Sequence, residues 1–183
     1  THPKGLHWSV TTLGERLIKE PMNMDLHNQL VEDCYDPFHL QVREMFQSLR
    51  EDQQTHNIYH LDLHSMPSMG TGMHNDPGEK RADIVVSDWR GKSSSPEFVQ
   101  LVIEAYERAG FEVAHNWPYF GGGITQTYGR PEQGHHTVQV ELNRARYMDE
   151  ETKQKLPEKF QDTQERLAQA IEFVAHGIKE RNL

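Results

Sequence analysis

Cysteine is nearly missing from this chain. Cys34 is the only cysteine among 183 residues, which excludes an intramolecular disulfide. A fold without cross-links depends on its apolar core, and a chain of this length can bury one within a single domain, 1–183. This cysteine usage suits a reducing compartment, so we expect a cytoplasmic protein.

Clusters of basic residues and long apolar runs are missing too. Lys and Arg total 19 against 28 Asp and Glu, a formal net charge of −9, so no nucleic-acid partner is expected. No apolar run approaches the roughly eighteen residues of a membrane span, so no membrane association is expected. The opening "THPKGLHWSV" has neither an initiating Met nor a signal pattern, and it reads as the middle of a loop.

Histidine, in contrast, is abundant, with 12 residues. This number makes metal binding or acid–base chemistry only slightly more plausible, because several of these histidines fall in predicted loops and need only be solvated there.

Apolar periodicity predicts helices alternating with strands. A helical stripe runs over 25–50 and should be kinked or split at Pro37. A second helix is predicted over 96–109, with Ser95 as its N-cap and Gly110 as its stop. Strands are predicted at 58–64, 83–88, 111–116 and 136–142, and a closing helix is predicted around 160–178. This order indicates an α/β fold with a mixed, largely parallel sheet flanked by helices.

The stretch "IYHLDLHSMPSMG" at 58–70 is a predicted strand whose end becomes polar. Alternate side chains of a strand point to opposite faces, so His60, Asp62 and His64 share one face. In open α/β sheets, ligands bind at the carboxyl ends of the strands. From this stretch alone two interpretations stay open: His64 is a core histidine satisfied by Asp62, or it belongs to a functional site.

The stretch "HHTVQVELNRARYMDE" at 135–150 places a second polar group on a predicted strand, because Gln139 and Glu141 share one face. A carboxylate inside a sheet is costly unless it is paired, metal-bound or facing a wet cleft. An ion pair with Arg144 or Arg146 would satisfy it. Alternatively, a histidine and a glutamate at two strand ends form part of a metal-assisted hydrolase, in which imidazole ligates the metal and the carboxylate accepts a proton from water.

Three blocks of the chain follow one another at suitable spacing: "LDLHSMPS", "RADIVVSDWRGKSSSP" and "GGGITQTYGRPEQGHHTVQVELNRARYMDE". They resemble the N-formylglutamate amidohydrolase (deformylase) family, which is related in fold to zinc carboxypeptidases and aspartoacylase-like deacylases. The resemblance runs from about Gly5 to the last helix. It implies a zinc-carboxypeptidase-like (phosphorylase/hydrolase-like) architecture. It also implies hydrolysis of a small-molecule substrate, N-formyl-L-glutamate, to formate and L-glutamate in histidine degradation.

The resemblance carries two roles onto residues of this chain. "LDLHS" is similar to the strand that supplies the last zinc ligand of zinc carboxypeptidases, which makes His64 a metal ligand. "VQVELNR" is similar to their strand with the general base, which makes Glu141 that base. Asp62 is then expected to orient a ligand or a neighbouring loop rather than to bind metal itself.

Members of the family have a further N-terminal portion, with a histidine-bearing loop and an arginine segment for the substrate's carboxylates. This chain begins downstream of both, so we expect an N-terminally truncated, C-terminal part of the family domain. No spacing typical of paired ligands is found at the other candidate histidines, which are His2, His7, His74, His135 and His136. Zinc or another divalent metal would therefore be incompletely coordinated. An uncovered apolar side of the sheet would invite self-association.

The glycine-rich segment 121–134 is expected to be a mobile loop over the site. Within it, Tyr128 could donate a hydrogen bond to a developing oxyanion, and Arg130 could bind a substrate carboxylate. Arg90, before a serine-rich turn, could bind an anion. For each of the three, a packing or solvated role is equally open.

Two functions from different classes remain. The first is a metal-dependent amidohydrolase that cleaves the N-acyl bond of an acidic amino acid, or a deacylase for a different N-acyl amino acid. The second is a catalytically silent α/β fragment or binding module.

Overall fold

The sheet has four strands in the spatial order β1-β4-β2-β3. The computed structural model describes residues 6–11, 13–18, 21–53 and 56–183. Strand β1 (Ile58–Met66) pairs in parallel with β4 (His135–Asn143), and β2 (Ile84–Ser87) pairs in parallel with β3 (Val113–His115). The contact between β2 and β4 is antiparallel, so the sheet is mixed and largely parallel, as the sequence predicts.

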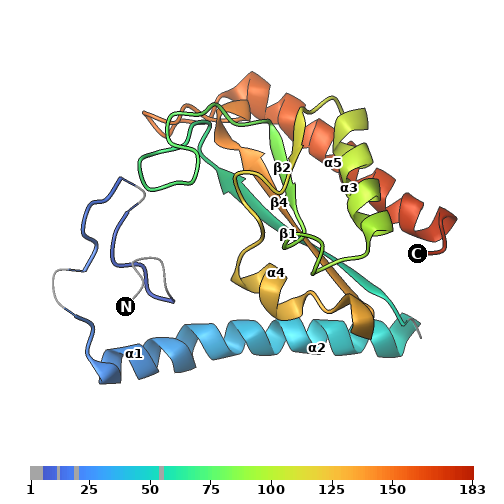
Figure 1. Ribbon diagram of the computed structural model, residues 1–183, viewed down its shortest axis with the longest axis horizontal. Coiled ribbons are helices and arrows are strands. Elements are labelled where there is room, and N and C mark those ends of the chain that lie inside the picture. Colours follow the sequence, from blue (N-terminus) through green and yellow to red (C-terminus); the bar gives the residue numbers. More distant parts are fainter. Residues whose placement is uncertain (1–5, 12, 19–20, 54–55) are drawn as a thin grey trace.

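Helices α3 (Pro96–Arg108) and α5 (Pro157–Glu180) lie side by side against one face of the sheet (Figure 1). Apolar side chains of α3, α5, β2 and β4 form the main core there, which includes Phe98 and Tyr106. The predicted start of α3 is confirmed, because the hydroxyl of Ser95 accepts a hydrogen bond from the backbone N–H of Phe98 at 3.4 Å. Gly110 follows the helix with φ +84°, a conformation that favours glycine.

The opposite face of the sheet meets α2 (Asp36–Gln53) and α4 (Gly123–Tyr128), which appear below it in Figure 1. Helix α1 (Met24–Leu30) runs into α2 through a π-helical turn at Val31–Tyr35. Pro37 therefore occupies the first turn of α2, where its missing N–H costs little. The sequence predicts a kink or break at Pro37, and the irregular turn lies a few residues before it.

The prediction that 121–134 is a loop throughout is wrong. Residues 123–128 form α4, and Pro131–Gln133 form a short 3-10 helix. Thr125 and Tyr128 of α4 are buried, so this segment packs onto β4 and α2 instead of hanging over the site.

Helix α2 leaves several large apolar side chains in solvent. Phe38 is 51% exposed and Met45 is 62% exposed. These side chains lie on a helix, whereas the predicted self-association used an uncovered apolar side of the sheet; it stays a prediction. None of the helices formed by the described residues has the length and hydropathy of a membrane-spanning segment.

Candidate active site

Polar side chains from β1 and β4 open into a cavity of about 470 Å³. His64 and Glu141 are direct partners in the parallel register of the two strands, so their side chains leave the same face of the sheet. Residues that follow β1 and residues near Tyr119 complete the walls. The lining consists of Trp8, His64, Ser65, Pro67, Met73, His74, Asn75, Asp76, Arg81, Pro118, Tyr119, Glu141 and Arg144.

His64 is not a core histidine, because 46% of its side chain is exposed. Its Nε2 lies 3.0 Å from Oδ1 of Asp62, whose other carboxylate oxygen is buried without a hydrogen-bond partner. The hydrogen bond to Asp62 raises the pKa of His64 above its ordinary value, against the opposing effect of burial. Asp62 thus holds the imidazole at the cavity, and its role in orienting a metal ligand there stays a prediction.

Glu141 is 7% exposed, and its carboxylate is only half satisfied. Gln139 donates from Nε2 to Oε1 of Glu141 at 3.0 Å, whereas Oε2 is buried and has no hydrogen-bond partner. Burial raises the pKa of Glu141, and the nearby Asp62 adds to the rise. A buried carboxylate with one free oxygen and a raised pKa is suited to accept a proton.

Gln139 also ties Glu141 to the glycine-rich segment. Its Oε1 accepts a hydrogen bond from the backbone N–H of Gly122 at 2.7 Å. A Cβ at position 122 would lie 3.0 Å from this oxygen, so the close approach of the backbone favours glycine. The amide of Gln139 therefore fixes both the carboxylate and the turn that leads into α4.

The alternative ion pair of Glu141 with Arg144 or Arg146 is not found among the described residues. Arg144 pairs with Glu150 at 3.4 Å, and Arg146 pairs with Asp83 at 3.7 Å. Glu141 thus keeps a free oxygen in a cavity that Arg144 also lines.

Two of the predicted substrate-binding residues lie away from this cavity. Tyr128 is 7% exposed, and its hydroxyl contacts Nδ1 of His39 at 2.5 Å in the cluster between α2 and α4. Arg130 donates from Nη1 to the carbonyl oxygens of Gln126 and Gly129, at 2.7 Å each. The structure therefore does not bring these two side chains together with His64 and Glu141.

Arg90 lines a second hollow of about 410 Å³, which shares Asn75, Pro118 and Tyr119 with the first. Its guanidinium lies 4.1 Å from the centre of the Phe120 ring. Residues 89–91 all have positive φ, so this tight turn sets the direction of the side chain. Arg90 is exposed and sits beside the candidate site rather than in it.

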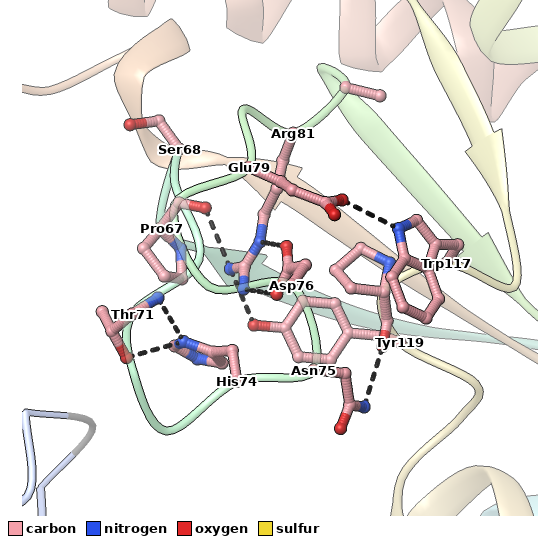
Figure 2. A network of polar contacts seen from close by, with 12 residues as sticks. Pro67, Ser68, Thr71, His74, Asn75, Asp76, Glu79, Arg81, Trp117 and Tyr119 are labelled. Carbon is pink, nitrogen blue, oxygen red and sulfur yellow. Dashed lines mark hydrogen bonds and ion pairs between the residues drawn. The ribbon is translucent and has the colours of Figure 1, made fainter.

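The sequence-based predictions missed a polar group in the wall of the cavity. Arg81 and Asp76 form a buried ion pair, and Arg81 also contacts the hydroxyl of Tyr119 (Figure 2). The available signal was "DPGEKRAD", in which an acidic and a basic residue flank a turn before a strand.

The donor set fits a divalent metal only in part. His64 offers an imidazole, and Asp62 and Glu141 each have a buried carboxylate oxygen without a hydrogen-bond partner. Within the described ranges, no group of three or more His, Cys, Asp or Glu side chains could hold a metal ion. No such group among these residues includes His7, His74, His135 or His136. His2 lies outside the described residues.

Comparisons with known proteins agree on one family. A family model described as N-formylglutamate amidohydrolase matches residues 1–148. The N-formylglutamate deformylase of Pseudomonas putida is 28% identical over 149 residues, which is 80% of this chain and 54% of that protein. The chain thus spans about half the length of this curated relative.

Two solved structures share the fold. The N-formylglutamate amidohydrolase from Ralstonia eutropha JMP134 matches with a TM-score of 0.82 and 24% identity, over 98% of this chain and 63% of that one. A gene product of Agrobacterium tumefaciens matches with a TM-score of 0.65 and 13% identity, over 96% of this chain and 62% of that one. At these identities the likeness shows the fold.

Proposed function

This chain belongs to the N-formylglutamate amidohydrolase family, and we propose that its cavity is part of the active site of a metal-dependent amidohydrolase. The proposed reaction is hydrolysis of the N-acyl amide bond of an acidic amino acid, with N-formyl-L-glutamate as the first candidate. Formate and L-glutamate would be the products, as in a late step of histidine degradation.

The observation that carries this proposal is the state of Glu141. Its Oε2 is buried, unpartnered and in the wall of a cavity, and its register partner is His64. A buried carboxylate with one unpartnered oxygen destabilises the fold. Its presence in the wall of a cavity therefore favours a role in the reaction.

Glu141 is the proposed general base and acid. Its Oε2 accepts a proton from the water that attacks the acyl carbon. As the C–N bond breaks, Glu141 returns this proton to the leaving amine, so that the amino acid leaves as a neutral amine and the acyl group as the acid. Gln139 holds the other carboxylate oxygen, which keeps Oε2 directed at the reacting atoms.

His64 is the residue proposed to bind the metal, with Asp62 fixing the orientation of the imidazole. When bound, zinc or another divalent ion would act as a Lewis acid and lower the pKa of water. Catalytic zinc usually has three protein ligands. The remaining ligands of the proposed site are therefore not among the groups that the described residues bring to His64.

The test is an assay of the full-length protein after metal loading. Release of a primary amine would be measured on N-formyl-L-glutamate, N-formyl-L-aspartate, N-acetyl-L-glutamate and N-acetyl-L-aspartate, with N-formyl-L-leucine as the neutral control. We expect the largest kcat/KM on N-formyl-L-glutamate, loss of activity with a chelator and recovery when metal is returned. A preference for another compound of the panel would assign a different deacylase. No release from any of them would favour a silent binding module and contradict the proposal.

A further inference from the structure

A buried ion pair stands in the wall of the cavity. The side chains of Arg81 and Asp76 are each 1% exposed. Nε of Arg81 donates to Oδ2 of Asp76 at 2.7 Å, and Nη2 donates to Oδ1 at 2.8 Å, so the pair is bidentate. Burying two charges carries a large desolvation penalty, and such a pair is weak evidence of a purely stabilising role.

The remaining donors of Arg81 point to two other groups. Nη1 donates to the carbonyl oxygen of Pro67 at 3.1 Å and to the hydroxyl oxygen of Tyr119 at 2.9 Å. Four of the five N–H groups of a guanidinium are thereby engaged, and its charge is balanced by Asp76. Arg81 is therefore not free to clamp a substrate carboxylate, but it holds the Tyr119 hydroxyl in one place.

The backbone around Tyr119 is anchored as well. The hydroxyl of Ser87 donates to the carbonyl oxygen of Tyr119 at 2.9 Å. Just before Tyr119 in the chain, Trp117 donates from its indole nitrogen to Glu79 at 3.4 Å, and Asn75 donates to the carbonyl oxygen of Pro118 at 3.5 Å. Figure 2 shows the Tyr119 ring beside the Asp76–Arg81 pair, with its hydroxyl at the guanidinium.

A phenol that accepts a hydrogen bond still has its own hydrogen to donate. Tyr119 accepts from Arg81 and lines the same cavity as Glu141 and His64, and none of the hydrogen bonds found in the described part of the chain uses its O–H as donor. We propose that the Tyr119 hydroxyl donates a hydrogen bond to the acyl oxygen of the substrate as that oxygen gains negative charge, and that the Asp76–Arg81 pair positions it. This inference rests on the function proposed above.

Two properties of the site agree with this role. Burial raises the pKa of Tyr119, and Glu141 adds to the rise while Arg81 opposes it, so the phenol stays protonated near neutral pH. A fixed donor needs no reorganisation when charge develops on the substrate, and this is the property that makes such donors effective.

The first test compares Tyr119→Phe with Tyr106→Phe in the full-length, metal-loaded protein. Tyr106 is a matched control, because it is buried on the other face of the sheet in the main core. Tyr119→Phe removes one oxygen atom and should fold normally. We expect kcat to fall about 10²-fold or more with little change in KM, because the lost interaction forms only as charge develops. Tyr106→Phe should leave both parameters unchanged.

The second test separates positioning from structure by a double-mutant cycle. Arg81→Lys should lower kcat in the wild-type background and have no further effect when Phe stands at position 119, because its role runs through the hydroxyl. An equal loss in both backgrounds would overturn the positioning role. If Arg81→Lys does not fold, Asp76→Glu keeps both charges and serves in the same cycle.

The outcomes distinguish the two proposals. An active wild-type protein whose Tyr119→Phe variant keeps its kcat would overturn this inference alone. A wild-type protein that hydrolyses no compound of the panel would overturn the proposed function and this inference with it.

Discussion

His64 on β1 and Glu141 on β4 face each other as register partners across two parallel strands. Because parallel neighbours end at the same edge of the sheet, this pairing brings an imidazole and a carboxylate to one cavity although they lie 77 positions apart in the sequence. One residue of slip in either strand would turn one of the two side chains to the core face. The register is thus part of the site.

Substitution of His64 tests the proposed metal ligand. His64→Ala removes the imidazole that pairs in register with Glu141, and we expect the full-length protein to lose bound zinc and its activity together. Each protein is dialysed against zinc and then against buffer, and elemental analysis measures its zinc content. His176→Ala is the control, because His176 is exposed on α5. An unchanged zinc content in His64→Ala would remove His64 from the ligand set.

The Asp76–Arg81 pair predicts how stability depends on pH. The hydrogen bond from Arg81 holds the pKa of Asp76 below its ordinary value of 3.8. A carboxyl whose pKa is lowered in the folded state stabilises the fold above its unfolded pKa, and this contribution is lost as pH falls from about 3.8 towards the lower folded value. Asp76→Asn leaves a buried guanidinium unpaired and should cost about 3–5 kcal/mol near neutral pH.

Urea denaturation of the wild type and Asp76→Asn at a series of pH values measures this effect. The difference between the two proteins should shrink as the acid range is entered. Glu104→Gln is the control, since Glu104 forms its ion pairs with Arg108 and Arg181 at the surface, and it should change stability far less. A difference between wild type and Asp76→Asn that is constant with pH would contradict the assignment.

Two glycines, one at each end of α4, should respond differently to substitution by alanine. At Gly129, after α4, a Cβ would lie 2.6 Å from Cα of Ser93 and 2.7 Å from the carbonyl oxygen of Thr125. Since backbone cannot yield easily, Gly129→Ala should destabilise the protein by about 1–3 kcal/mol. At Gly123 a Cβ meets nothing within 4 Å, so Gly123→Ala should be neutral or slightly stabilising. Thermal unfolding of both variants compares them, and equal melting temperatures would contradict the packing described.

The sequence predicts most elements because their signals are local. The N-cap Ser95, the positive φ of Gly110 and the alternation along β1 and β4 each depend on neighbouring residues, and the structure has them. The polar faces of β1 and β4 could likewise be assigned by parity alone.

The parts of the site that escaped prediction depend on packing between distant segments. Tyr128 and Arg130 follow a glycine run that is typical of a mobile loop, but the apolar side chains of α4 pack against α2 and turn both residues away from the cavity. Tyr119 reaches the site through Arg81, which is 38 positions earlier, and no spacing rule connects the two. Such contacts follow from the strand order β1-β4-β2-β3, which local periodicity does not determine.

The steady-state kinetics of Glu141→Gln in the full-length, zinc-loaded protein test whether Glu141 is the general base. Glutamine keeps the shape of the side chain but cannot accept a proton, so turnover of N-formyl-L-glutamate should fall by roughly 10²–10⁴-fold while the zinc content stays that of the wild type. Glu172→Gln, at an exposed position of α5, should turn over substrate as the wild type does. A Glu141→Gln protein with near-normal turnover would contradict the account, because the buried, half-satisfied carboxylate would then have no part in the reaction.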